Sequence, residues 1–310
     1  MTHYYSLNDY CRETFGHKLY KLSLDGGMTC PNRDGTIGTG GCIFCSENGS
    51  GEFAEKFCQD ISAQIERAKQ KVQHKNKNGK YIAYFQSFTN TYAPAEYLEK
   101  IFTEAINHPD TEVLSVATRP DCLGDDILNL LESLNKIKPV WVELGFQTSN
   151  EKSALYIGRG YDNRVFENAV KNLNARGIKT VAHIILGLPD ETFEDMKNSV
   201  DFVCSCGIWG IKLHLLHILD GARIKADFES GKFSCLSRDE YLDIVCRLLR
   251  IIPGNIVIHR LTGDGDKRRL VAPLWSGNKK DVLNTLNKKL RDENVIQGSE
   301  CTVNSTEMII

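Results

Sequence analysis

The sequence has 310 residues, of which 25% are charged and 41% hydrophobic, and its formal net charge is −2 at pH 7. This composition is ordinary for a soluble globular protein, and the charge by itself argues neither for nor against a nucleic-acid partner. No apolar run approaches the ~18 residues that a membrane-spanning helix needs, and the polar N-terminus has no signal-peptide core, so we expect a cytoplasmic protein without membrane contact.

Short β-rich runs alternate with helical patterns along most of the chain. We predict strands at 19–24, 81–86, 112–118, 140–146, 179–187 and 210–218, and helices at 53–72, 94–107, 125–136, 163–177 and 192–207. Such alternation predicts a parallel sheet with right-handed crossovers. The third to fifth strands are continuously apolar, as expected when both faces of a sheet are covered. A further helix at 237–252, a strand at 255–261, a helix at 279–293 and a polar tail at 297–310 follow.

Polar and special residues collect where the predicted strands end. "QSFTNTY" follows the second strand, "TRPD" the third, "QTSN" the fourth and "GLPDET" the fifth, and the sixth ends near His217. Parallel α/β folds build their sites at the carboxyl ends of their strands. We therefore predict a functional site at this edge.

The cysteines are the strongest chemical signal. There are eleven, an odd number, which does not fit a disulfide scaffold in a chain of this length. Cys204, Cys206 and Cys246 lie within apolar patterns, where cysteine is a small hydrophobic residue. Only Cys30, Cys42 and Cys45 share a glycine-rich loop, "TCPNRDGTIGTGGCIFC".

Three thiols in one loop indicate a soft or borderline metal, either zinc or an iron–sulfur cluster. A structural zinc needs four ligands, and Cys11, Cys58 and His17 are alternatives for the fourth without convincing spacing. A cluster held by three cysteines leaves one iron open for a substrate or cofactor. The loop must double back to join its thiols, and Gly35, Gly38, Gly40 and Gly41 permit the positive-φ turns that this requires. Phe44 is expected to exclude water beside the metal.

The segment "LSLDGGMTCPNRDGTIGTGGCIFC" resembles the radical S-adenosylmethionine (SAM) superfamily, and within it a bacterial family related to the catalytic subunit of Elongator. "YFQSFTNTYAP", "SVATRPDCL", "ELGFQT", "HIILGLPDET" and "APLW" carry the same resemblance over roughly residues 4 to 290. The spacing departs from the usual CxxxCxxC motif of the superfamily. The resemblance implies a partial (β/α)6 barrel of radical SAM type with a short C-terminal α/β extension. The corresponding domains are an N-terminal segment (1–18), a core barrel (19–255) and an extension (256–310).

The resemblance also implies the cofactors, a 4Fe–4S cluster on Cys30, Cys42 and Cys45 and SAM as ligand of the open iron. Reductive cleavage of SAM would give a 5′-deoxyadenosyl radical, with the electron supplied by a donor such as flavodoxin or ferredoxin. Further cofactor contacts carry over from relatives, and for one of them, His183, a core histidine satisfied by its neighbours is an equal alternative. The implied contacts are Gln147 as a polar contact, Arg159 as a carboxylate-binding arginine, His183 near the ribose, and Gly187 and Pro189 in the "GLP" turn near adenine.

The implied substrate is a tRNA wobble uridine, converted from its carboxymethylaminomethyl to its aminomethyl form. The Lys/Arg-rich segments 67–80 and 266–291 fit an anionic partner, although solvated helix ends explain either segment alone. Two alternatives stay open. One is a radical SAM enzyme acting on a small metabolite or a protein, and the other is a non-catalytic, zinc-stabilised RNA-binding protein.

Overall fold

The computed structural model describes residues 2–47, 49, 51, 53–74, 79–263 and 265–301, so most of the predicted tail and part of the segment 67–80 lie outside the described residues. The strands are β1 (Tyr20–Leu24), β2 (Tyr81–Phe85), β3 (Thr111–Thr118), β4 (Val140–Gln147), β5 (Lys179–Leu186), β6 (Gly210–Leu215), β7 (Ile218–Leu219), β8 (Val257–Arg260) and β9 (Leu270–Ala272). The α-helices are α1 (Leu7–Phe15), α2 (Ile61–Val72), α3 (Ala95–Asn107), α4 (Asp125–Asn135), α5 (Glu151–Tyr156), α6 (Asn163–Asn174), α7 (Phe193–Ser205), α8 (Ile224–Glu229), α9 (Arg238–Ile251) and α10 (Lys279–Asp292). Two 3-10 helices lie at Pro120–Cys122 and Leu274–Gly277.

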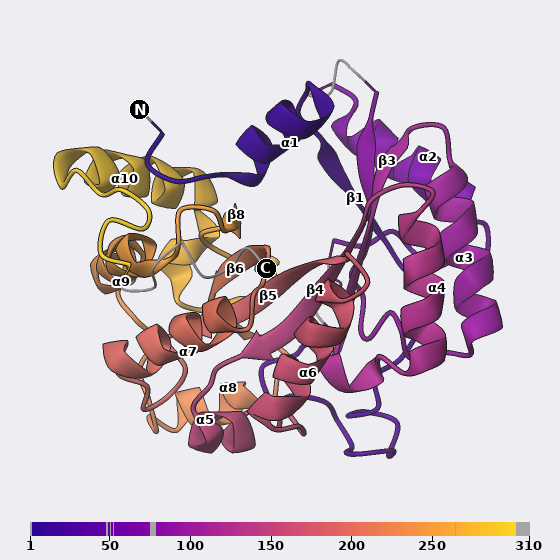
Figure 1. The fold of residues 1–310 in the computed structure, drawn as a ribbon. Coiled ribbons are helices and arrows are strands. Elements are labelled where there is room, and N and C mark those ends of the chain that lie inside the picture. Colours follow the sequence, from indigo (N-terminus) through magenta and orange to yellow (C-terminus); the bar gives the residue numbers. More distant parts are fainter. Residues whose placement is uncertain are drawn as a thin grey trace.

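Seven strands form one curled parallel sheet in the order β1-β2-β3-β4-β5-β6-β8. Helices α2, α3, α4, α6, α7 and α9 lie along its outer side, and the sheet curves around an interior as a half-barrel (Figure 1). The predicted partial barrel of radical SAM type is confirmed. The strand at 257–260, which we assigned to the extension, pairs with β6 and continues the sheet past residue 255.

Local sequence explains where the helices begin and end. Asp60 caps α2 by accepting a hydrogen bond from the Ala63 amide, so this helix begins at Ile61 and not at residue 53 as predicted. The predicted glycine terminators are present after α6 and α7, where Gly177 and Gly207 have φ of 66° and 81°. No described helix is long and apolar enough to span a membrane.

The two faces of the sheet have different chemistry. The outer face packs apolar side chains such as Leu144, Ala182 and Leu213 against the helices, and all three are fully buried. The inner face of β4 and β5 instead carries Glu143 and His183, so the prediction of continuously apolar strands is wrong for that face. Tyr10 of α1 packs against Trp141 and Trp209 and closes the amino end of the barrel.

Candidate metal and cofactor site

The cysteine loop leaves the carboxyl end of β1 and returns to α2, where strand ends of the half-barrel gather. Gly35, Gly40 and Gly41 have φ of 95°, 82° and 77°, so three of the four glycines make the predicted left-handed turns. Gly38 is different, because its φ is not in this region and a Cβ there would collide with Asn32 Oδ1. This glycine permits a close approach instead.

The groups around the Cys42 sulfur favour its thiolate form. A side-chain hydrogen bond with Cys45 is the largest cause that lowers the pKa of Cys42 to about 7, and the charge of Arg119 and the Asn32 amide act in the same direction. Asn32 Nδ2 lies 3.4 Å from Cys42 Sγ. Arg119 also interacts electrostatically with Cys30. One arginine thus acts on two of the three predicted ligands, and a thiolate is the form that binds metal.

The loop is held by contacts with distant segments of the chain. Asn32 Nδ2 donates to the Gly158 carbonyl at 2.6 Å, and the Ile43 amide donates to the Ile157 carbonyl at 3.0 Å. Arg223 donates to the carbonyl of Gly41. The turn after α5 and the start of α8 therefore fix the loop over the carboxyl edge of the sheet.

The alternative fourth ligands lie elsewhere. Cys11 is buried with Tyr84 and Trp141 at the amino end of the barrel, and His17 follows α1 at the same end. Cys58 contacts Arg67 Nη2 at 3.2 Å and the Asp60 carbonyl. Cys122, a thiol that our sequence reading did not single out, lies close enough to interact with Cys30, but burial raises its pKa to about 12. Each of these four groups is poorly placed or poorly ionised for a fourth bond.

Gln147 ends β4 in a strained conformation. Its φ is 69°, and the register between β4 and β5 shifts between Gly145 and Gln147. The Gln147 amide folds over Gly145, where a Cβ would lie 2.7 Å from Nε2. Positive φ at a non-glycine strand end is typical of a functional position, because surrounding structure must hold it there.

Arg159 is fully buried and bonds to the backbone around it. Its guanidinium donates to the carbonyls of Thr148 and Tyr161 at 2.7 and 2.9 Å, while Nη2 has no hydrogen-bond partner within the described ranges and lies 3.5 Å from Glu151. Arg119 donates to the Arg159 carbonyl and pairs with Asp121 at 2.7 Å. The sequence singled out Arg159, whereas the charge of Arg119 in "TRPD" acts on Cys30 and Cys42.

The remaining predicted contacts lie on β5 and just after it. His183 Nε2 is 2.8 Å from Glu143 Oε2, and burial followed by the charge of Lys212 lowers the pKa of His183 to about 4, so the imidazole is neutral. Gly187 has φ of 81°, and a Cβ there would lie 2.7 Å from the Leu236 side chain. Pro189 follows in the same turn, before Asp190, which also has a positive φ.

Sequence reasoning missed a buried ionic network inside the barrel. Glu143 is fully buried and accepts from Lys21 Nζ at 2.5 Å, from Ser115 Oγ at 2.8 Å and from Lys212 Nζ. These partners come from β1, β3 and β6. Both "VWVELGF" and "GIKLHLLHI" contain an ionisable residue within an apolar run, which was the available signal.

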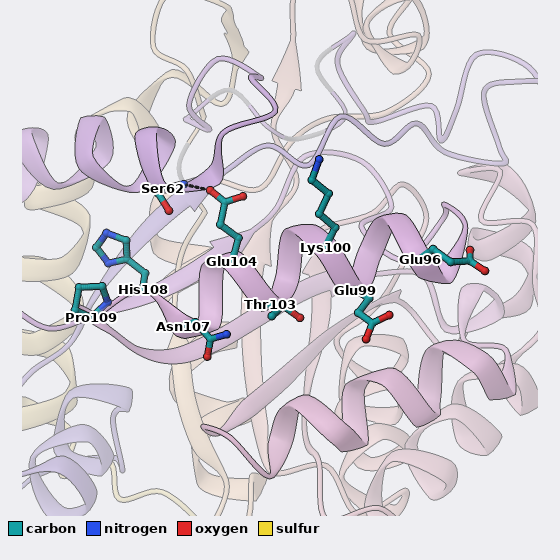
Figure 2. Close-up of a pocket in the computed structure, with 9 residues that line it drawn as sticks. All are labelled: Ser62, Glu96, Glu99, Lys100, Thr103, Glu104, Asn107, His108 and Pro109. Carbon is teal, nitrogen blue, oxygen red and sulfur yellow. Dashed lines mark hydrogen bonds between the residues drawn. The ribbon is translucent and has the colours of Figure 1, made fainter.

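The hollow on the outer side of α3, about 720 Å³ in volume, is not part of this site. Figure 2 shows Glu96, Glu104 and other side chains of α3 lining it, with the Ser62 amide bonded to Glu104. Nearby, Glu66, His108 and Asp110 bring three possible metal ligands together. Lys69 Nζ pairs with the carboxylates of both Glu66 and Asp110, so an ammonium group already occupies the place that a metal ion would take.

Glu191 in the "GLPDET" turn is a buried carboxyl group that should make the stability of the protein depend on pH. It accepts from Thr148 Oγ1 at 2.5 Å, its Oε2 is buried without a partner in the described structure, and burial raises its pKa to about 7. A raised pKa means that folding favours the protonated carboxyl, so its stabilisation is complete below the unfolded pKa of 4.5 and is lost as pH rises through about 7. Urea unfolding should show that the free energy of unfolding of wild type falls relative to that of Glu191→Gln between pH 4.5 and pH 8. If the free energies of unfolding of the two proteins changed in parallel with pH, the raised pKa of Glu191 would be contradicted.

Comparisons with known proteins match most of the chain. The family model described as "Radical SAM superfamily" matches residues 33–203, and "Radical_SAM C-terminal domain" matches residues 208–292. The chain is 45% identical to the protein YtqA of Bacillus subtilis (strain 168), over 95% of this chain and 92% of YtqA. It is 24% identical to Elongator complex protein 3 of Homo sapiens, over 56% of this chain and 31% of that protein.

The solved structure of an archaeal Elp3 from Methanocaldococcus infernus has the same fold. It superposes with a TM-score of 0.69 at 14% identity, covering 90% of this chain and 64% of that one. The chain thus spans less than two thirds of the archaeal Elp3 and about a third of the human protein.

Proposed function

The chain belongs to the radical SAM superfamily, and from this we propose that Cys30, Cys42 and Cys45 bind its 4Fe–4S cluster and that its substrate is a tRNA wobble uridine. Enzymes of this superfamily use a 4Fe–4S cluster and SAM, and these are the cofactors of this chain. When bound, they supply a 5′-deoxyadenosyl radical that removes a hydrogen atom from a C–H position of the substrate. Zinc as a purely structural metal has no further support.

The residues of the loop fit a three-thiolate cluster. The lowered pKa of Cys42, the contact of Cys45 with it, and the electrostatic reach of Arg119 to Cys30 and Cys42 favour thiolates. Asn90 adds a buried Oδ1 without a hydrogen-bond partner in the described chain, while its Nδ2 donates to the Ala117 carbonyl at 2.8 Å. This orphaned acceptor sits on the β2–α3 connection, whose Thr89 amide bonds to Thr29 beside Cys30.

For SAM we propose contacts along the same strand edge. Gln147 presents its amide where β4 ends, and Gly187 and Pro189 turn the chain after β5. For a carboxylate, Arg159 offers Nη2, which makes no hydrogen bond in the described chain but lies 3.5 Å from Glu151, while its remaining donors bond to the backbone and to Asn163. His183 is neutral and bonded to Glu143, so any ribose contact must use its other ring nitrogen. The electron comes from an external reductant, and flavodoxin or ferredoxin is the proposed class.

The near full-length resemblance to the bacterial family related to the catalytic subunit of Elongator carries the tRNA proposal. Charge adds less than the sequence suggested. In the described part of 67–80, Lys69 pairs with Asp110 and Lys71 with Glu55, so acids from outside the segment compensate part of its positive charge. On α10, Lys289 pairs with Asp243. In the loop at 266–269, Arg268 pairs with Asp266 at 2.9 Å and Arg269 lies 3.9 Å from Glu47 of the cysteine loop, while Lys267 is exposed beside them.

An anaerobic reaction tests this function directly. Reconstituted enzyme, SAM, a reductant and tRNA carrying carboxymethylaminomethyluridine should consume that nucleoside and form the aminomethyl product, with 5′-deoxyadenosine as co-product. Nucleoside analysis after digestion measures all three, and the Cys42→Ala variant is the matched control that should form none. Formation of 5′-deoxyadenosine with unchanged wobble nucleosides, both here and in tRNA from a deletion strain, would discard tRNA and retain the radical chemistry.

A further inference from the structure

Arg119, the residue after β3, is a buried cation that lies against the cysteine loop. The turn that follows α5 connects the two, because the Cys42 sulfur lies 3.6 Å from the Gly158 carbonyl and Arg119 Nη1 donates to the next carbonyl of the turn at 2.9 Å. A Cβ at Gly160 would lie 3.5 Å from Arg119 Nη2 and 3.3 Å from Ile37 Cδ1. The guanidinium and the middle of the cysteine loop therefore pack on the same glycine.

The guanidinium of Arg119 is held in one orientation. Nε and Nη2 donate to the two carboxylate oxygens of Asp121 at 2.9 and 2.7 Å, and the guanidinium carbon lies 5.1 Å from the centre of the Tyr161 ring. The Tyr161 hydroxyl donates to the Gly145 carbonyl near the end of β4. A guanidinium with these contacts is not free to swing into solvent, so the distance between its charge and the loop is fixed.

The charge of this arginine reaches the thiols. It acts on both Cys30 and Cys42. The Arg119 side chain is 10% exposed, whereas that of Asp121 is 23% exposed. Water reduces the effect of a charge in proportion to its contact with solvent, so the carboxylate of this pair is screened more strongly than the guanidinium. The pair should therefore leave a positive potential at the two sulfurs.

We propose that Arg119 raises the reduction potential of the iron–sulfur cluster. The inference rests on the proposed function, which assigns the cluster to Cys30, Cys42 and Cys45. When the external reductant gives up one electron and the cluster takes it, no bond forms or breaks, and the cluster with its thiolates becomes one unit more negative. A fixed and weakly screened positive charge stabilises the more negative form, because local charge is one of the factors that set the potential. Arg119 needs no contact with the substrate for this effect.

A redox titration of the reconstituted protein with dithionite and mediator dyes, followed by visible absorbance, tests the proposal. Arg119→Gln should lower the equilibrium constant for one-electron reduction about tenfold, which is a shift of about 59 mV to lower potential. Arg119→Lys keeps the charge and should retain most of the wild-type potential. Asp121→Asn removes the opposing charge and should raise the potential. Arg250→Gln is the control, because Arg250 lies on the outer helix α9, 3.5 Å from Glu300, and should cause no shift.

A lost charge and a lost contact give different results. If Arg119 only supported the turn, Arg119→Lys and Asp121→Asn would lower the potential as Arg119→Gln does, because each breaks the bidentate pair, and the proposal would be overturned. Equal potentials of wild type and a fully loaded Arg119→Gln would overturn it as well. Where Arg119→Gln does not hold a full cluster, Asp121→Asn decides, since only a rise supports a charge effect.

The titration also separates this inference from the proposed function. It contains no substrate, so its result does not depend on whether the enzyme acts on tRNA. A cluster that survives in Cys42→Ala rejects the cysteine assignment, whatever potential Arg119→Gln has. Iron content and circular dichroism of each variant are compared with those of wild type before the titration, so that a folding or loading defect is recognised.

Discussion

Replacing Cys42 by alanine should leave a folded protein that retains almost no iron–sulfur cluster after anaerobic reconstitution, and Cys30→Ala and Cys45→Ala should do the same. Each thiolate would hold a different iron, so the loss of one leaves two open irons and an unstable cluster. Cys122, the neighbouring thiol, is a poor replacement because burial raises its pKa to about 12. Iron content, sulfide content and visible absorbance measure the effect.

Matched thiol controls make this result specific. Cys58→Ala, Cys204→Ala and Cys11→Ala should keep a full cluster, since Cys58 contacts Arg67 outside the site, Cys204 is in the outer core and Cys11 lies at the far end of the barrel. A full cluster in the variant lacking Cys30, Cys42 and Cys45 would reject the assignment. Loss of the cluster in Cys122→Ala would move one ligand to that residue.

The parallel sheet could be predicted from the sequence because each strand and the helix after it have a local signal. An apolar run marks the element, and a glycine often marks the end of the helix. Sequence reasoning misplaced the start of α2, since the seven residues 53–59 before Asp60 have helix-compatible side chains and only the cap at Asp60 decides the boundary. It also left the strand at 257–260 outside the barrel. Nothing in "NIVIHRL" reveals that β6 has an open edge for it to join.

The parts of the site that lie close together in the sequence could be predicted, whereas the parts that only the fold brings together were missed. Three cysteines within sixteen residues identify a metal loop without knowledge of the fold, and glycine spacing explains how the loop turns. The partners of Glu143 lie 122 residues away at Lys21 and 69 residues away at Lys212, so only the barrel brings them together. For the same reason, sequence could not show that the charge of Arg119 acts on two of the three cysteines.

Removing the charge of Glu143 should cause a large loss of stability. Glu143→Gln leaves the ammonium groups of Lys21 and Lys212 without their shared carboxylate inside the barrel, and breaking a buried pair from one side costs about 3–5 kcal/mol. Urea unfolding at pH 7 measures the difference. Adding Lys212→Met should restore much of it, since the more deeply buried of the two unpaired cations is then gone.

The pH dependence of that loss identifies its cause. Burial holds the pKa of Lys212 well below its usual 10.5, and the charge of Glu143 is the main opposing effect, so Glu143→Gln lowers this pKa further. A lysine with a depressed folded pKa costs stability while the unfolded chain binds its proton, and that cost vanishes as pH rises past 10.5. The deficit of Glu143→Gln relative to wild type should therefore shrink over the pH range in which wild-type Lys212 loses its proton, which lies below 10.5. A deficit that stays constant over this range would indicate lost packing or hydrogen bonding at Glu143, and not an unpaired ammonium.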